Sequence, residues 1–274
     1  MTEALARLLR SPQGALGSAL LLALAVPVVA GPWLAPYDPE QFHFTARLLG
    51  PGPDFWLGTD QFGRDLLSRL LVGARSTVLM AVAATALGTG LGAVIGNVSA
   101  FAGGRLDEIV MRLLDAVMAI PGLLFALLIV TALGASELNA LIAIGITFTP
   151  GMARIARSVA LTVRKQDYVS AAIARGETQG YIVLREMLPN CVAPIIVEAT
   201  IRVAFAVMLL ATLSFLGLGA QPPSSEWGLM VAEARQFIFR NPWMIVWPGI
   251  AIAVVAVGFN LLGDGLRDAL NPRT

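Results

Sequence analysis

Long apolar runs dominate this sequence and limit what it can fold into. A helix that crosses a membrane needs about 20 mainly apolar residues. Because lipid offers no partner for backbone polar groups, spanning segments must be helices or closed barrels. Runs of this length indicate helices, so we predict an all-α, polytopic membrane protein with six transmembrane helices. The candidate runs are approximately Ala15–Trp33, Ser76–Phe101, Leu106–Leu133, Leu138–Ala156, Ala193–Leu218 and Trp243–Leu262.

The composition favours a membrane environment over water. Only 14% of the 274 residues are charged and 57% are hydrophobic, whereas a soluble domain carries about 25% charged residues. A soluble all-helical protein with so little charge would lack the polar surface needed to cover itself. The net charge of +1 also provides no basic face for nucleic acid. We therefore expect membrane lipid, and not nucleic acid, around this chain.

The scarce residue types exclude several chemistries. With one cysteine, Cys191, and one histidine, His43, the chain can form neither an internal disulfide nor a zinc cluster. The single lysine, Lys165, follows no glycine-rich loop, so the chain lacks the P-loop needed to bind and hydrolyse ATP. The glycines of 88–93 lie inside an apolar run and are interpreted as helix packing. We therefore expect no catalytic residue, metal or cofactor.

The apolar runs divide the chain into segments. Arg7 and Arg10 precede the first run, as they would in a cleavable signal peptide, but the length of the run and the further runs favour an uncleaved helix. In the connector that follows, the spacing over Gln61–Leu71 predicts a short amphipathic helix at the interface, with Asp60 as its N-cap. The expected segments are an N-terminus (1–14), a first transmembrane helix (15–35), the connector (36–75), a core domain with five transmembrane helices (76–266) and a tail (267–274).

Two features predict how the spans pack and bend. Gly88, Gly92 and Gly96 recur every four residues, which places them on one helix face where a neighbouring helix can approach closely. Pro121 predicts a kink in the third span. Near the start of that span, Arg112 and Asp115 are three residues apart and should be neighbours on the helix surface.

The distribution of basic residues predicts the orientation. Six spans place both termini on one side, and that side carries about twice as many Arg and Lys as the other. Cytoplasmic loops carry the excess of these residues. Both termini, and the polar island over 157–190, are therefore predicted to be cytoplasmic.

The polar island separates the fourth and fifth spans. Asp167 can cap a helix over Tyr168–Arg175, and Gly176 can close it in a left-handed conformation. Small side chains on this helix would form a narrow knob that fits a cleft in another protein. A second short helix over Thr178–Met187 should stop before Pro189. On these residues alone, a solvated cytoplasmic hairpin is an equally good interpretation.

The island resembles the EAA loop of binding-protein-dependent ABC importer permeases. That motif has Glu-Ala-Ala, then a Gly four residues after the last Ala, and then Leu-Pro. The matching positions are Ala171–Ala172, Gly176 and Leu188–Pro189. Ser170 replaces the Glu of the motif, and Glu186 stands where Ile is usual.

Two longer stretches narrow the resemblance. The stretch 55–65, FWLGTDQFGRD, resembles the connector motif of the peptide/nickel subfamily. The stretch 213–223, LSFLGLGAQPP, followed by Glu226-Trp227-Gly228, is similar to the second permease subunit of that subfamily, the DppC/OppC type. The resemblance extends over 55–271, nearly the whole chain.

The resemblance implies a fold and a division of labour. It implies the type I ABC importer permease fold with a cytoplasmic coupling helix, in a multi-pass protein of the bacterial inner membrane. A second permease subunit would complete the pore as a heterodimer, two ATPase subunits would hydrolyse ATP, and a solute-binding protein would deliver dipeptides or oligopeptides. The residues implied in coupling to the ATPases are Asp167, Tyr168, Ser170, Ala171, Ala172, Gly176, Leu188 and Pro189.

Other functions remain as alternatives. Within the same family, the solute could be nickel or another small solute. Outside it, the chain could be an ATP-independent channel or an integral-membrane enzyme.

Two charges lie within the fifth span. Glu198 and Arg202 are four residues apart, and charges in lipid usually face a cavity or a partner. They could neutralise each other, or they could line the translocation path and meet a charged peptide terminus. We advance the second interpretation as a hypothesis.

Overall fold

The computed structural model describes residues 2–270, and this part of the chain is helical. It contains no β-strand within those residues, only an isolated bridge between Thr59 and Asp65. The expected all-α architecture is confirmed. The helices are α1 (Thr2–Arg10), α2 (Pro12–Leu34), α3 (Leu66–Ala102), α4 (Gly104–Met118), α5 (Gly122–Leu133), α6 (Glu137–Val163), α7 (Asp167–Ala174), α8 (Gln179–Tyr181), the π-helical segment η1 (Ile182–Met187), α9 (Leu188–Phe215), α10 (Trp227–Ala234), the short 3-10 helix η2 (Arg235–Phe237) and α11 (Trp243–Leu270).

The described residues provide five helices long and apolar enough to cross a membrane, and a sixth candidate span if α4 and α5 are taken together. This agrees with the six predicted runs. The third run is broken and not merely kinked, because α4 and α5 meet at 89°. Pro121 explains the break: it has no N–H for the helix ladder and it disfavours helical backbone at the residue before it.

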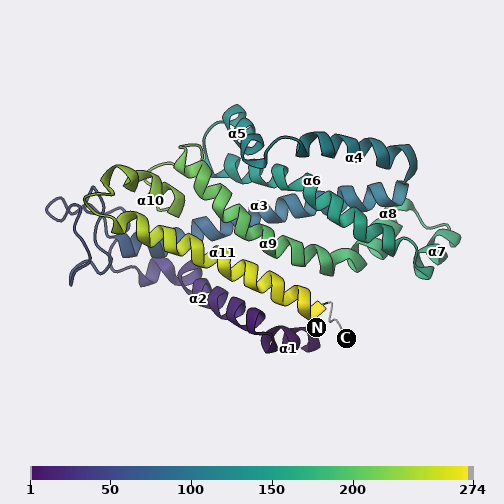
Figure 1. Ribbon diagram of the computed structural model, residues 1–274, viewed down its shortest axis with the longest axis horizontal. Coiled ribbons are helices and arrows are strands. Elements are labelled where there is room, and N and C mark those ends of the chain that lie inside the picture. Colours follow the sequence, from purple (N-terminus) through teal and green to yellow (C-terminus); the bar gives the residue numbers. More distant parts are fainter. Residues whose placement is uncertain (1, 271–274) are drawn as a thin grey trace.

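The spans form an elongated bundle (Figure 1). The connector between α2 and α3 lies at one end together with α10, and α7 lies at the opposite end. Helix α1 and the last turns of α11 both lie toward the α7 end, as an even number of spans requires. In the view of Figure 1, α9 runs between α6 and α11 in front, with α3 behind them.

The glycine stripe of α3 packs against α6, as predicted. A Cβ atom added at Gly92 would lie 2.5 Å from the Cβ of Met152, and one added at Gly96 would lie 2.3 Å from the Ala153 carbonyl oxygen. No larger residue fits without separating the helices. The stripe is therefore the contact surface that brings the two backbones together.

The prediction of a separate amphipathic helix over Gln61–Leu71 is wrong. Helix α3 begins at Leu66 and continues without a break through the second span, and its N-cap is Asp65, which accepts a hydrogen bond from the Ser68 N–H at 2.8 Å. The expected cap, Asp60, is held in the loop before it. Leu66 is buried inside the bundle, so its apolar face packs against protein and not at a membrane interface. The helix of the second span thus begins at Leu66, before the expected start of that span at 76.

The two ends of the chain differ from the expected segments. Helix α2 already begins at Pro12, preceded by α1, so the N-terminal 1–14 segment is helical from Thr2. Helix α11 continues to Leu270 and includes the first part of the expected tail, while 271–274 lie outside the described residues.

Arg112 and Asp115 do not pair with each other. Arg112 forms an ion pair with Glu108 at 2.8 Å, and Asp115 pairs with Arg154 of α6. Asp115 therefore ties α4 to α6.

Candidate functional site

Helix α7 begins one residue earlier than predicted. Its backbone is helical from Asp167, and the N-cap position belongs to Gln166, whose extended backbone makes no side-chain capping bond. Asp167 is therefore not the N-cap but the first helical residue. There its negative charge stabilises the positive end of the helix dipole.

The predicted left-handed closure of α7 at Gly176 is confirmed. Gly176 has φ +77, a conformation that a side chain makes costly. Its N–H donates to the Ile173 carbonyl at 3.0 Å, and the Glu177 N–H donates to the Ala172 carbonyl at 3.2 Å. This pair of bonds is a Schellman motif. It turns the chain back toward α8 and fixes where α7 ends.

One face of α7 is buried and the other is exposed. Val169 and Ala172 are fully buried in a cluster that includes Ile182 and Met187. Ala172 thus packs α7 against η1, on the opposite side of the helix from its exposed residues. The exposed residues of the helix are Asp167, Tyr168, Ser170, Ala171, Ile173 and Ala174.

Ile173 is a candidate docking residue that sequence reasoning missed. Its side chain is 51% exposed at the tip of the molecule. The buried positions 169 and 172 repeat with the helical period, and this signal could have placed Ile173 on the outer face. Tyr168 is also partly exposed, and burial raises the pKa of its phenol, with the neighbouring Cys191 and Glu186 acting in the same direction.

We expected the second short helix to stop before Pro189, but it does not. Segment η1 continues directly into α9, with Pro189 in the first turn of α9. A π-helical turn is wider than an α-helical one, and this width accommodates a residue without an N–H. Leu188 is half-buried and Pro189 is exposed.

Glu186, which replaces the usual Ile of the motif, contacts α7. Arg175 at the end of α7 lies 3.6 Å from the Glu186 carboxylate and 3.5 Å from that of Glu177. These exposed pairs add little free energy. They orient the end of α7 relative to η1.

Glu198 and Arg202 form the predicted i, i+4 ion pair on α9, with 3.2 Å between Oε1 of Glu198 and Nη2 of Arg202. The guanidinium also lies over the ring of Phe148, 5.5 Å from its centroid. A Cβ at Gly151 would come within 2.8 Å of Nη2, so this glycine leaves room for the guanidinium. The Arg202 Nε is buried without a hydrogen-bond partner among the described residues.

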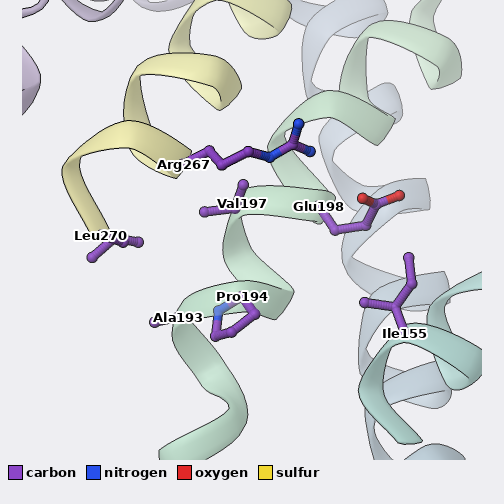
Figure 2. Close-up of a pocket in the computed structure, with 7 residues that line it drawn as sticks. All are labelled: Ile155, Ala193, Pro194, Val197, Glu198, Arg267 and Leu270. Carbon is purple, nitrogen blue, oxygen red and sulfur yellow. The ribbon is translucent and has the colours of Figure 1, made fainter. Parts of the chain in front are cut away.

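The pair lies on an open stripe of α9, which we call the α9 face: Glu198, Arg202, Phe205, Met208 and Thr212. The side chains of Phe205 and Met208 are more than half exposed. Arg202 lines two cavities of about 430 and 260 Å³ with residues of α5 and α6. Glu198 lines a third, of about 390 Å³, toward the α7 end of the stripe (Figure 2).

A buried charge network at the opposite end escaped sequence reasoning. Asp60 accepts from Arg64 at 2.6 Å and from Arg69 at 2.8 Å, and Glu233 of α10 accepts from both arginines at 3.0 Å. Asp60, Arg64 and Arg69 are each at most 3% exposed. We call these four residues the connector network. It ties the LGTDQFGRD stretch to α10.

The Glu226-Trp227-Gly228 motif stabilises the same end of the bundle. The Glu226 carboxylate accepts from the N–H groups of Gly228 and Leu229, each at 2.9 Å, and so caps α10. Burial raises the pKa of Glu226, and the two N–H donors oppose that shift. Trp227 donates from its indole to the Leu70 carbonyl at 3.0 Å. The motif therefore fixes α10 against α3.

The chain matches two family models. Residues 66–274 match the family described as "Binding-protein-dependent transport system inner membrane component". Residues 1–51 match the N-terminal transmembrane domain of oligopeptide transport permease C. The first match begins at Leu66, where α3 begins.

Curated relatives match nearly the full chain. A probable D,D-dipeptide transport system permease protein of Escherichia coli is 41% identical over 96% of this chain and 88% of its own length. The dipeptide transport system permease protein of Alkalihalophilus pseudofirmus is 40% identical over 93% of this chain and 83% of its own length. A glutathione transport system permease protein of E. coli is 39% identical over 97% of this chain and 89% of its own length.

A solved structure shares the fold. A chain of the MetNI methionine ABC transporter, in an inward-facing conformation, superposes with a TM-score of 0.59 at 18% identity, covering 73% of this chain and 95% of that one. This confirms the expected type I importer permease fold. The chain belongs to the inner-membrane permease family of binding-protein-dependent ABC importers, whose members are non-catalytic transport subunits of multi-pass architecture.

Proposed function

We propose that this chain is half of the translocation pore of an ATP-driven importer of dipeptides or oligopeptides. Two separate features of the bundle support the proposal. A rigidly capped helix, α7, stands at one end of the bundle, and an open stripe with charges and cavities, the α9 face, runs along it. The first serves coupling and the second serves passage of the solute.

Helix α7 is the coupling helix in this proposal. Two ATPase subunits dock beneath the permeases, and each permease inserts one such helix into an ATPase cleft. Closure of the ATPases then moves both helices and rocks the spans. Because Val169 and Ala172 anchor α7 to η1, a push on its exposed face is transmitted to α9. The α7 end and both termini are cytoplasmic in this arrangement.

The α9 face meets a second, different permease subunit across the pore. Its apolar residues are exposed in the single chain, and the Glu198–Arg202 pair would be costly in lipid. A partner or a water-filled path removes that cost. A solute-binding protein delivers the solute at the opposite end, where the connector and α10 lie.

The relatives support a peptide as the solute. Several of them are named for dipeptide transport, at about 40% identity over most of the chain. The test is uptake into vesicles that contain the purified complex: this chain, the second permease, the ATPases and the binding protein. Labelled dialanine should accumulate only with ATP. Accumulation of nickel alone, or flux without ATP, would contradict the proposal.

The Glu198–Arg202 pair should be required in that assay. Replacing it with Gln and Met keeps the volume and removes both charges, and we expect uptake to fall by about tenfold, about 1.4 kcal/mol. The matched control is the exposed α4 pair, Glu108→Gln with Arg112→Met. Unchanged uptake by the Glu198–Arg202 double variant in a fully assembled complex would remove the pair from the translocation path.

A further inference from the structure

We infer that the cavity between Glu198 and Arg267 binds the two charged ends of a short zwitterionic peptide. The inference rests on the proposed function and deepens it, because it assigns a solute site to the permease itself. It also gives a role to Arg267, which sequence reasoning counted only as a basic residue of the tail.

The cavity has the size and walls of a small-ligand site. Its volume is about 390 Å³, within the range of about 300–1,000 Å³ typical of ligand pockets. Figure 2 shows Arg267 reaching from α11 across α9, with Glu198 projecting from α9 beyond it. The remaining walls are apolar and come from three helices: Ile155 of α6, Ala193, Pro194 and Val197 of α9, and Leu270 of α11.

The charged groups at this cavity retain free hydrogen-bonding capacity. Glu198 uses Oε1 for its ion pair with Arg202, which leaves Oε2 for another donor. Arg267 is exposed and forms no ion pair or side-chain hydrogen bond with the residues whose side chains the structure describes, 6–270. Arg267 and Glu198 are the two charged side chains that line the cavity, and Arg202 pairs with Glu198 from outside it. Because the Glu198 charge is partly neutralised while that of Arg267 is not, an anionic group gains the most on binding.

A free peptide complements this arrangement. The planar guanidinium of Arg267 can hold an α-carboxylate through two parallel hydrogen bonds, and Glu198 can accept from an α-ammonium. The apolar walls suit the side chains between the two ends. Since Arg202 already neutralises part of the Glu198 charge, the α-carboxylate should contribute more to affinity than the α-ammonium.

A lipid head group is the competing ligand, because Arg267 lies near one end of the bundle. The Glu198 carboxylate on the same cavity repels a phosphate and favours a ligand that also carries an ammonium. The binding test therefore uses nanodiscs of phosphatidylcholine. The quaternary ammonium of this lipid has no N–H to donate to Glu198, so the lipid cannot make both of the contacts proposed for the peptide.

The test measures binding to the complex of this chain, the second permease and the ATPases in phosphatidylcholine nanodiscs, without the binding protein. The probes are L-Ala-L-Ala and its C-terminal amide. Their binding is measured by titration calorimetry or saturation-transfer NMR. We expect the amide to bind at least tenfold more weakly than the free peptide. Arg267→Gln should weaken the free peptide by a similar factor and leave the amide unchanged.

Two further variants separate the site from folding and from total charge. Arg267→Lys keeps the cation but loses the two parallel hydrogen bonds, so it should bind the free peptide more tightly than Arg267→Gln and more weakly than the unmodified chain. Arg7→Gln removes an exposed cation from the same end of the bundle, outside the cavity, and should have no effect. Equal binding of peptide and amide, or normal peptide binding by Arg267→Gln, would overturn the inference. The second result would favour a lipid head group as the ligand of Arg267.

The inference and the proposed function fail in different ways. If ATP drives no peptide into vesicles even with the binding protein present, the proposed function is wrong. If uptake proceeds but binding does not depend on Arg267, only the site assignment is wrong.

Discussion

Replacing Gly176 with proline should reduce ATP-driven uptake by more than tenfold while the spans remain assembled. Gly176 has φ +77 and donates its N–H to the Ile173 carbonyl, whereas proline fixes φ near −65° and has no N–H. The misfit costs about 3 kcal/mol or more, which is enough to unwind the end of α7. The measurement is dialanine uptake together with ATP hydrolysis by the same vesicles, and hydrolysis should continue without transport.

Gly180→Ala is the matched control for this prediction. Gly180 lies nearby in α8, has no positive φ, and a Cβ added there meets nothing within 4 Å. It should transport normally. If Gly176→Pro supports full uptake, the closure of α7 has no part in coupling.

Replacing Arg69 with methionine should lower the free energy of unfolding by about 3–5 kcal/mol, the usual result of removing one partner from a buried ion pair. The change leaves Asp60 and Glu233 sharing only Arg64, and it also removes the donor to the Ser224 carbonyl. We expect the connector to separate from α10. Chemical denaturation of the purified complex, and the amount of chain in membranes, measure the effect.

Arg112→Met provides the comparison. Arg112 has the same charge but pairs with Glu108 on the surface, where its side chain is 77% exposed, so the loss should be below about 0.5 kcal/mol. Similar destabilisation by both variants would contradict the importance given to burial of the connector network.

Local sequence patterns predicted the features that depend on nearby residues. The apolar runs predicted the spans, the four-residue glycine repeat predicted a close helix contact on one face of α3, and Gly176 predicted the end of α7. That the contacting helix is α6 came only from the structure. The i, i+4 spacing likewise gave the Glu198–Arg202 pair. In each case the deciding interaction lies within one helix or on one helix face, so spacing alone determines it.

Features that depend on distant partners could not be read from the sequence. Arg69 and Glu233 are 164 positions apart, and nothing in their local context reveals that they meet. The start of α3 was misplaced for the same reason, because Leu66 is buried by residues elsewhere in the bundle. Local rules predict that a helix ends before Pro189, whereas the π-helical turn lets the helix continue through it.

The most direct test of the central claim is whether α7 touches an ATPase. Cys191 is the only cysteine of the chain and is buried, so Cys191→Ser allows a single new cysteine at Ser170 to report contacts by crosslinking in the assembled complex. A second single-cysteine chain, Phe239→Cys, places the probe at a fully exposed position of the opposite end. We expect position 170 to crosslink to an ATPase subunit, and position 239 to crosslink only to the binding protein. An ATPase crosslink from position 239, or none from position 170, would contradict the claim.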